Sequence, residues 1–147
     1  MKRLLLSVLI IGLTGFFFSC AKKNPAPNNA PTNSMTASIS GTAWTAKTLS
    51  VVANMVDITI TATAKDGSDI QMTMAPGVKA GNSYTFSQSG QYTFQYSNGV
   101  TNFLVNSGTL MITSYSNKVM VGTFTASVTG GGVTNSVTNG NFTAIFP

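Results

Sequence analysis

The chain has 147 residues, with eight lysines and arginines against three acidic residues, no histidine, and only 7% charged residues. The absence of histidine and glutamate excludes Ser-His-Asp triads, Cys-His pairs and histidine-based zinc or iron sites. The basic residues are scattered rather than clustered, so the composition argues against a nucleic-acid-binding surface. We therefore expect a protein that is not an enzyme and that carries no cofactor.

The first twenty residues have the pattern of a secretory signal peptide. Lys2 and Arg3 precede an apolar stretch over residues 4–18, which is too short to cross a bilayer comfortably as a helix. Ser19, a small residue, then precedes Cys20, the only cysteine in the chain. This arrangement resembles the lipobox of bacterial lipoproteins, in which the cysteine receives a diacylglycerol and becomes the first mature residue. The alternative is an ordinary signal peptide followed by an incidental thiol.

The segment after Cys20 is predicted to be a disordered tether. It reads AKKNPAPNNAPTNS and contains no large apolar side chain, so it cannot bury enough surface to offset the entropy of ordering. Its two lysines, Lys22 and Lys23, lie next to the predicted anchor, where they could contact anionic headgroups. The predicted organisation is a signal peptide over residues 1–19, the lipidated Cys20 with its tether over 20–34, and one domain over 35–147.

From residue 35 onward the sequence predicts short β-strands. Apolar and polar residues alternate with period two, most clearly over residues 56–64 and 70–74. Further strands are predicted over 84–86, 92–96, 100–105, 109–115, 119–128 and 136–146. Turns of two to five residues force neighbouring strands to pair antiparallel. The expected fold is therefore an all-β antiparallel meander of about 8–10 strands, closed as a barrel or folded as a curved sandwich, with essentially no helix.

Glycine-containing segments mark the expected turns. Asp66-Gly67 and Asn98-Gly99 suit tight hairpins, and Ser107-Gly108 separates two predicted strands. Gly122 lies inside a strand, where its missing side chain indicates a bulge or a close crossing. The three glycines at 130–132 predict a flexible loop.

Three segments of the predicted domain resemble a known group of proteins. ASISGTAWTA at 37–46, VGTFTASV at 121–128 and TNGNFTAIF at 138–146 look like a family of small uncharacterised lipoproteins common in Bacteroidota. The resemblance implies an all-β lipoprotein domain without an assigned activity. Lipoproteins exported to the cell surface in that phylum often carry an acidic run after the lipidated cysteine. This chain has none, which implies an outer-membrane anchor that faces the periplasm.

The aspartates are the only carboxylates available for catalysis or metal binding. Asp66 and Asp69 are close in sequence, but they flank a predicted hairpin tip, where solvated turn carboxylates are the ordinary finding. A calcium site in the same DGSD segment would lack the ligand number and loop pattern of an EF-hand. We predict neither catalytic nor metal-binding residues.

Aromatic residues are the remaining candidates for binding. Tyr84, Tyr92 and Tyr96 fall on neighbouring predicted strands, and Trp44 is the single tryptophan. Such a series is most often cross-strand core packing, and the alternative is a face that binds a sugar or lipid. These four residues are the candidate ligand-binding residues.

Two functional hypotheses follow. The first is a non-enzymatic envelope module, anchored to the membrane, that has a structural role or contacts a protein or glycan partner. The second is a carrier of a small hydrophobic or lipid ligand in a barrel cavity. A filled core would argue against the second hypothesis, and a cavity of about 300 Å³ or more would support it.

Overall fold

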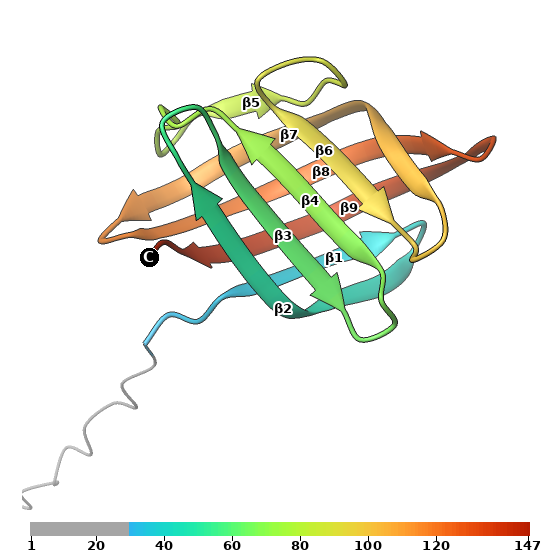
Figure 1. Ribbon diagram of the computed structural model, residues 1–147, viewed down its shortest axis with the longest axis horizontal. Helices are drawn as coiled ribbons and strands as arrows, with labels where there is room; N and C mark the ends of the chain where they lie inside the picture. Colours follow the sequence, from blue (N-terminus) through green and yellow to red (C-terminus); the bar gives the residue numbers. More distant parts are fainter. Residues whose placement is uncertain (1–29) are drawn as a thin grey trace, which may run out of the picture.

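The computed structural model describes residues 30–147, and these form an all-β domain (Figure 1). The predicted signal peptide and Cys20 lie outside the described residues. In the described part, no helix could span a membrane. The strands are β1 (Ser34–Ile39), β2 (Thr42–Ala53), β3 (Ile58–Ala64), β4 (Asp69–Met74), β5 (Ser83–Thr85), β6 (Thr93–Ser97), β7 (Asn102–Ser116), β8 (Val119–Gly130) and β9 (Val133–Ile145).

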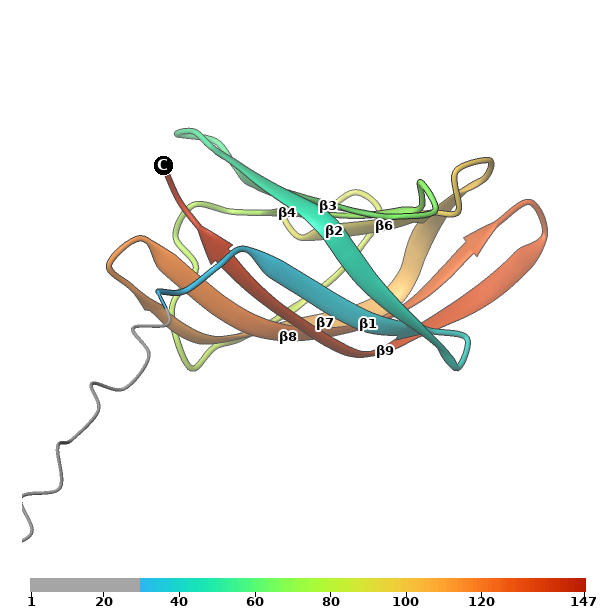
Figure 2. The same cartoon turned by 90° about the horizontal axis from the view of Figure 1, so that it is seen from below.

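Eight of these strands close into an antiparallel barrel. Each strand from β1 to β4 pairs with the next, β4 pairs with β6, and the series continues through β7, β8 and β9. Pairing of β9 with β1 closes the barrel (Figure 2). The strand β5, labelled in Figure 1, is an extra strand that pairs with β7. The prediction of an antiparallel meander is confirmed, and a barrel rather than a curved sandwich is the result.

The barrel has two ends. We call the end that contains residues 30–33, the β2–β3 turn and the β7–β8 turn the tether end, and the other end the far end. Both ribbon views place the start of the described chain and the C-terminus together at the left, with these two turns (Figures 1 and 2). The far end contains the β1–β2, β3–β4, β6–β7 and β8–β9 turns.

The interior is apolar and closely packed. Strands alternate between buried and accessible residues, as the period-two pattern predicts. Four phenylalanine rings form a continuous chain through the core, with centroid separations of 5.3, 5.6 and 6.4 Å; they are Phe86, Phe94, Phe124 and Phe142. The same core contains side chains from β3, β4, β7, β8 and β9 that are fully inaccessible to solvent.

Several predicted boundaries are wrong. Ser107-Gly108 does not separate two strands, because β7 runs without interruption from Asn102 to Ser116. Glycine is needed at 108 because an added Cβ would collide with the backbone of Thr125 on β8. The strand predicted from residue 56 starts at Ile58, and Val56 lies exposed in the β2–β3 turn.

The glycines at 130–132 form a tight hairpin turn rather than a flexible loop. Gly130 still pairs with Val133, so only Gly131 and Gly132 connect β8 to β9. Their φ angles are +58° and +79°, a conformation that a two-residue hairpin turn requires and that glycine adopts without steric cost.

Two glycines inside the long strands make room for phenylalanine rings. Gly122 of β8 lies opposite Phe142 of β9, and Gly140 of β9 lies opposite Phe124 of β8. An added Cβ would lie 2.6 Å from the Phe142 ring at position 122 and 2.5 Å from the Phe124 ring at position 140. Each strand therefore supplies one ring and one glycine, which explains the close crossing expected at Gly122.

Candidate functional site

Trp44 closes the far end of the barrel. Its indole is buried, and its Nε1 donates a hydrogen bond of 2.8 Å to the hydroxyl of Ser68, which in turn donates one of 2.6 Å to the carboxylate of Asp66. The backbone N–H of Ser68 also donates to Asp66, at 3.0 Å. The indole N–H is satisfied within the protein, so Trp44 takes part in a structural network that ties β2 to the β3–β4 turn.

Tyr84 and Tyr92 stack on each other beside the start of β6. Their ring centroids are 4.6 Å apart with an interplanar angle of 22°, and both side chains are half-buried. The Tyr84 hydroxyl accepts a 2.8 Å hydrogen bond from the backbone N–H of Lys79. This pair holds the 75–82 loop against the barrel.

Tyr96 lies near the far end, apart from the tyrosine pair. It is buried and packs against Phe103, with ring centroids 5.6 Å apart. The four-residue separation of Tyr92 and Tyr96 along one strand direction corresponds to about 13 Å. The candidate aromatic residues thus form two groups, Trp44 with Tyr96 towards the far end and Tyr84 with Tyr92 elsewhere, rather than one continuous binding face.

The far-end aspartates have opposite pKa shifts. Hydrogen bonds from the side chain and backbone of Ser68 lower the pKa of Asp66 below its ordinary value of 3.8. Partial burial raises the pKa of Asp69. Desolvation, followed by the negative charges of Asp66 and Asp69, raises the pKa of Tyr96 above 10.0. These groups belong to the turn and its packing, and among the described residues no cluster of three or more histidine, cysteine or acidic side chains could hold a metal ion.

A concave surface lies on the outside of the barrel wall. Two adjoining depressions of about 320 and 340 Å³ share Thr123 and Asn141 and cross β7, β8, β9 and β1. We call this surface the Thr/Asn groove. Along the floor of the groove lie Gly122, Phe124, Gly140 and Phe142. The other lining residues are Ser34, Thr36, Thr109, Met111, Thr113, Val121, Thr123, Thr125, Asn139, Asn141 and Thr143.

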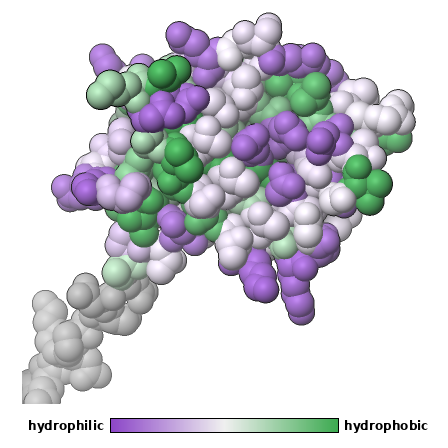
Figure 3. Space-filling view, in the orientation of Figure 1, coloured by the Kyte–Doolittle hydropathy of each residue, from purple (hydrophilic) through white to green (hydrophobic). Residues whose placement is uncertain are grey.

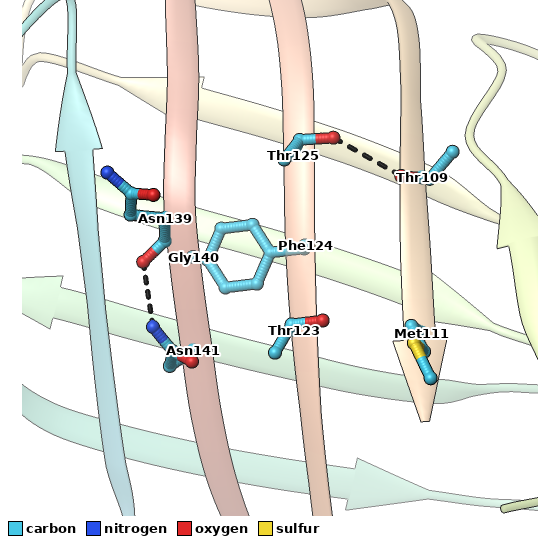
Figure 4. A pocket seen from close by; sticks show the side chains of 8 residues that line it. All are labelled: Thr109, Met111, Thr123, Phe124, Thr125, Asn139, Gly140 and Asn141. Carbon is cyan, nitrogen blue, oxygen red and sulfur yellow. Dashed lines mark hydrogen bonds between the residues drawn. The ribbon is translucent and has the colours of Figure 1, made fainter. Parts of the chain in front are cut away.

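The strand register places the central side chains of the groove in one row. Asn141 of β9 is the cross-strand partner of both Thr36 on β1 and Thr123 on β8. Thr123 in turn faces Met111 on β7, so one row of side chains crosses four strands. Figure 4 shows part of this surface, where the Thr109 and Thr125 hydroxyls are 3.2 Å apart and the Asn141 side chain donates to the carbonyl of Asn139 at 2.8 Å.

A β-bulge in β9 shapes the groove. The register shifts on both sides of β9, between Thr36 and Ser38 of β1 and between Phe124 and Ala126 of β8. Asn139, at the extra residue, has a φ of +51°, and Gly140 follows it. Bulges of this kind redirect side chains and are frequent near functional sites.

The groove is chemically neutral. None of its lining residues is ionisable, so it offers no general acid, general base or metal ligand of the usual types. It offers hydroxyl and amide groups, which can donate and accept hydrogen bonds, beside the apolar Met111 and Val121. This chemistry suits recognition of an uncharged polar partner.

Comparisons with protein-family models, curated proteins and solved structures gave no match to this chain.

The sequence analysis did not identify the Thr/Asn groove. The outward-facing threonines are recognisable from alternation alone, but their alignment depends on the pairing of β1 with β9. The TNGNF segment is the one local signal, because Asn-Gly inside a strand indicates a bulge.

Proposed function

We propose that this protein is a non-enzymatic module of the bacterial cell envelope that is held at a membrane by a lipid on Cys20 and binds an uncharged glycan along the Thr/Asn groove. The observation that carries the glycan proposal is the groove itself, a concave strip of hydroxyl and amide side chains without an ionisable group. The proposed location is the outer membrane, facing the periplasm.

The groove supports a glycan through its hydrogen-bonding capacity. Thr36, Asn141 and Thr123 form a row whose donors and acceptors can pair with sugar hydroxyls. Met111 extends the row and is 42% exposed, so it offers an apolar contact for a sugar ring. The absence of charge in the lining favours neutral over ionic ligands.

The packed interior argues against the carrier hypothesis. A ligand-sized cavity would leave its lining side chains accessible to a molecule of the size of water. Side chains around the barrel have no such accessibility; they include Ile60, Ile70, Met72, Met74, Leu110, Ile112, Met120, Val137 and Ala144. The depressions described above lie on the outer surface instead.

The glycan proposal is tested by binding of neutral oligosaccharides, with chitohexaose and maltohexaose as probes and hyaluronan as an anionic control. Thr123→Trp should block the centre of the groove and weaken binding of a neutral probe by about tenfold or more. Thr61→Trp, on the outer face of β3, is the matched control and should leave binding unchanged. Equal affinities of the two variants, or binding of hyaluronan alone, would contradict the proposal.

The anchor is tested by incorporation of labelled fatty acid in cells. The wild-type chain should be labelled, and Cys20→Ser should not, because the thiol that forms the thioether is gone. Labelling of the Cys20→Ser variant would show that the lipid is attached elsewhere, and an unlabelled wild type would remove the proposed anchor.

A further inference from the structure

The turn between β2 and β3 presents an exposed apolar group. Met55 is 98% exposed, Val56 80% and Val52 60%. Figure 3 shows a hydrophobic cluster at the upper left, where Figure 1 places this hairpin. We call these three residues the apolar tip. Exposing adjacent large apolar side chains at a turn costs hydrophobic free energy unless a partner covers them.

Three backbone N–H groups of the turn are paired by hydrogen bonds within it. The Asn54 side-chain oxygen accepts from the N–H groups of Val56 and Asp57, at 2.7 and 2.9 Å. The Asn54 amide donates to the Asp57 carboxylate at 2.8 Å, and the Asn54 N–H donates to the Asp57 carbonyl at 2.9 Å. These internal hydrogen bonds reduce the cost of moving the turn from water towards an apolar phase.

The tip lies at the tether end of the barrel. Asn33 fixes the start of the domain there, because its side chain accepts a 2.7 Å hydrogen bond from the N–H of Ile145. Thr36 of β1 pairs with Thr45 of β2, and β2 continues to Ala53. The β2–β3 hairpin therefore extends roughly 20 Å along β2 beyond the first residue of β1.

Chain length brings this end close to any lipid on Cys20. Thirteen residues separate Cys20 from Ser34, so the covalent reach between them is at most about 50 Å.

The charged side chains also favour an orientation with the tether end towards the bilayer. Lys79, Lys118 and Asp57 belong to the tether end, which gives it a net side-chain charge of +1, whereas Lys65, Asp66 and Asp69 belong to the far end, which gives it a net side-chain charge of −1. Anionic headgroups are attracted to the former and repelled by the latter.

From these observations we infer that the apolar tip is a second membrane contact, which inserts Met55 and Val56 into the interface of the bilayer that holds the lipid anchor. This contact rests on the proposed membrane anchorage. It fixes the orientation of the barrel, with its tether end on the bilayer and its far end in the aqueous phase. A lipid anchor alone would leave the domain free to tumble on its tether.

Fluorescence quenching by lipids with brominated acyl chains tests the inserted tip. Met55→Trp and Val100→Trp are made in the lipidated mature protein, reconstituted in vesicles of phosphatidylethanolamine and phosphatidylglycerol. Val100 is the matched control, since it is 94% exposed in a turn at the far end. Native Trp44 is buried and contributes the same background to both. Brominated lipids should quench the added emission at position 55 at least about twofold and leave that at position 100 unchanged.

Equal quenching of the two positions in vesicle-bound protein would overturn the tip contact while leaving the anchor intact. If the wild type carries no lipid, the anchor proposal fails, and the same two tryptophans are compared in the unlipidated chain with added vesicles. Selective quenching at position 55 would then still support the membrane contact of the tip, and equal quenching would overturn it.

Self-association is the other outcome that would overturn the membrane contact. If the chain self-associates with rising concentration and Met55→Asp abolishes this, the apolar tip binds a second copy of the chain.

Discussion

Two walls of the barrel pack the same core in different ways. The short wall, β3, β4 and β6, has strands of 7, 6 and 5 residues in uninterrupted register and contributes isoleucine, methionine and two aromatic side chains, Phe94 and Tyr96, neither of which covers a glycine. The long wall, β7, β8 and β9, has strands of 15, 12 and 13 residues, with register shifts in both of its pairings. It contributes phenylalanine rings that lie over glycines. The short wall therefore depends on apolar volume, whereas the long wall depends on particular residues at particular positions.

Removal of a ring from the long wall should have the largest effect. Phe124 contacts the rings of both Phe94 and Phe142 and covers Gly140. We expect Phe124→Ala to lower the free energy of unfolding by about 3–5 kcal/mol, since the cavity is surrounded by rigid strands. Urea denaturation measures this change, and a loss below about 1 kcal/mol would show that the long wall relaxes around the missing ring.

Addition of a methyl group at the paired glycine should have the next largest effect. A Cβ at Gly140 would lie 2.5 Å from both the ring and the carbonyl oxygen of Phe124, so Gly140→Ala should cost about 1–3 kcal/mol. The same change in the Phe124→Ala background should cost less, because part of the collision is gone. Gly77→Ala is the control, since nothing lies within 4 Å of its added Cβ. Equal costs at the two sites would contradict the ring–glycine pairing.

A volume-conserving change in the short wall should have a smaller effect. Met72 is fully buried on β4, opposite Ile60 and Phe94. Met72→Leu keeps the apolar volume, and we expect it to cost less than about 1.5 kcal/mol by urea denaturation. A cost as large as that of Phe124→Ala would show that the short wall is as specific as the long one.

The smallest effect on stability is expected for Tyr96→Phe in the short wall, and only at alkaline pH. The pKa of Tyr96 is raised by desolvation, and by Asp66 and Asp69, above its ordinary value of 10.0. The neutral phenol therefore contributes stability that is present below pH 10 and is lost as pH rises through the folded-state pKa. The stability of the wild type relative to Tyr96→Phe should fall as the pH rises above about 10. A constant difference over this rise in pH would contradict the shift.

The sequence predicts local features of both walls well. Alternation of apolar and polar residues identifies the inward faces, and Asp66-Gly67 and Asn98-Gly99 mark hairpins, because both signals depend on adjacent residues. The prediction of a turn at Gly108 is wrong, because the need for glycine there comes from the close approach of Thr125 on another strand. The Thr/Asn groove depends on the alignment of Thr36 with Asn141, which no local pattern specifies.

Closure of the barrel between β1 and β9 has a consequence for how the molecule acquires its structure. Ser34 pairs with Thr143, so the seam joins residues more than a hundred positions apart. Such non-local pairing makes folding slow compared with that of proteins stabilised by local contacts. Until β9 docks, β1 and β8 each present an open edge that can pair with another chain. A nascent or truncated polypeptide without its last strand is thus the form of this protein most prone to aggregate.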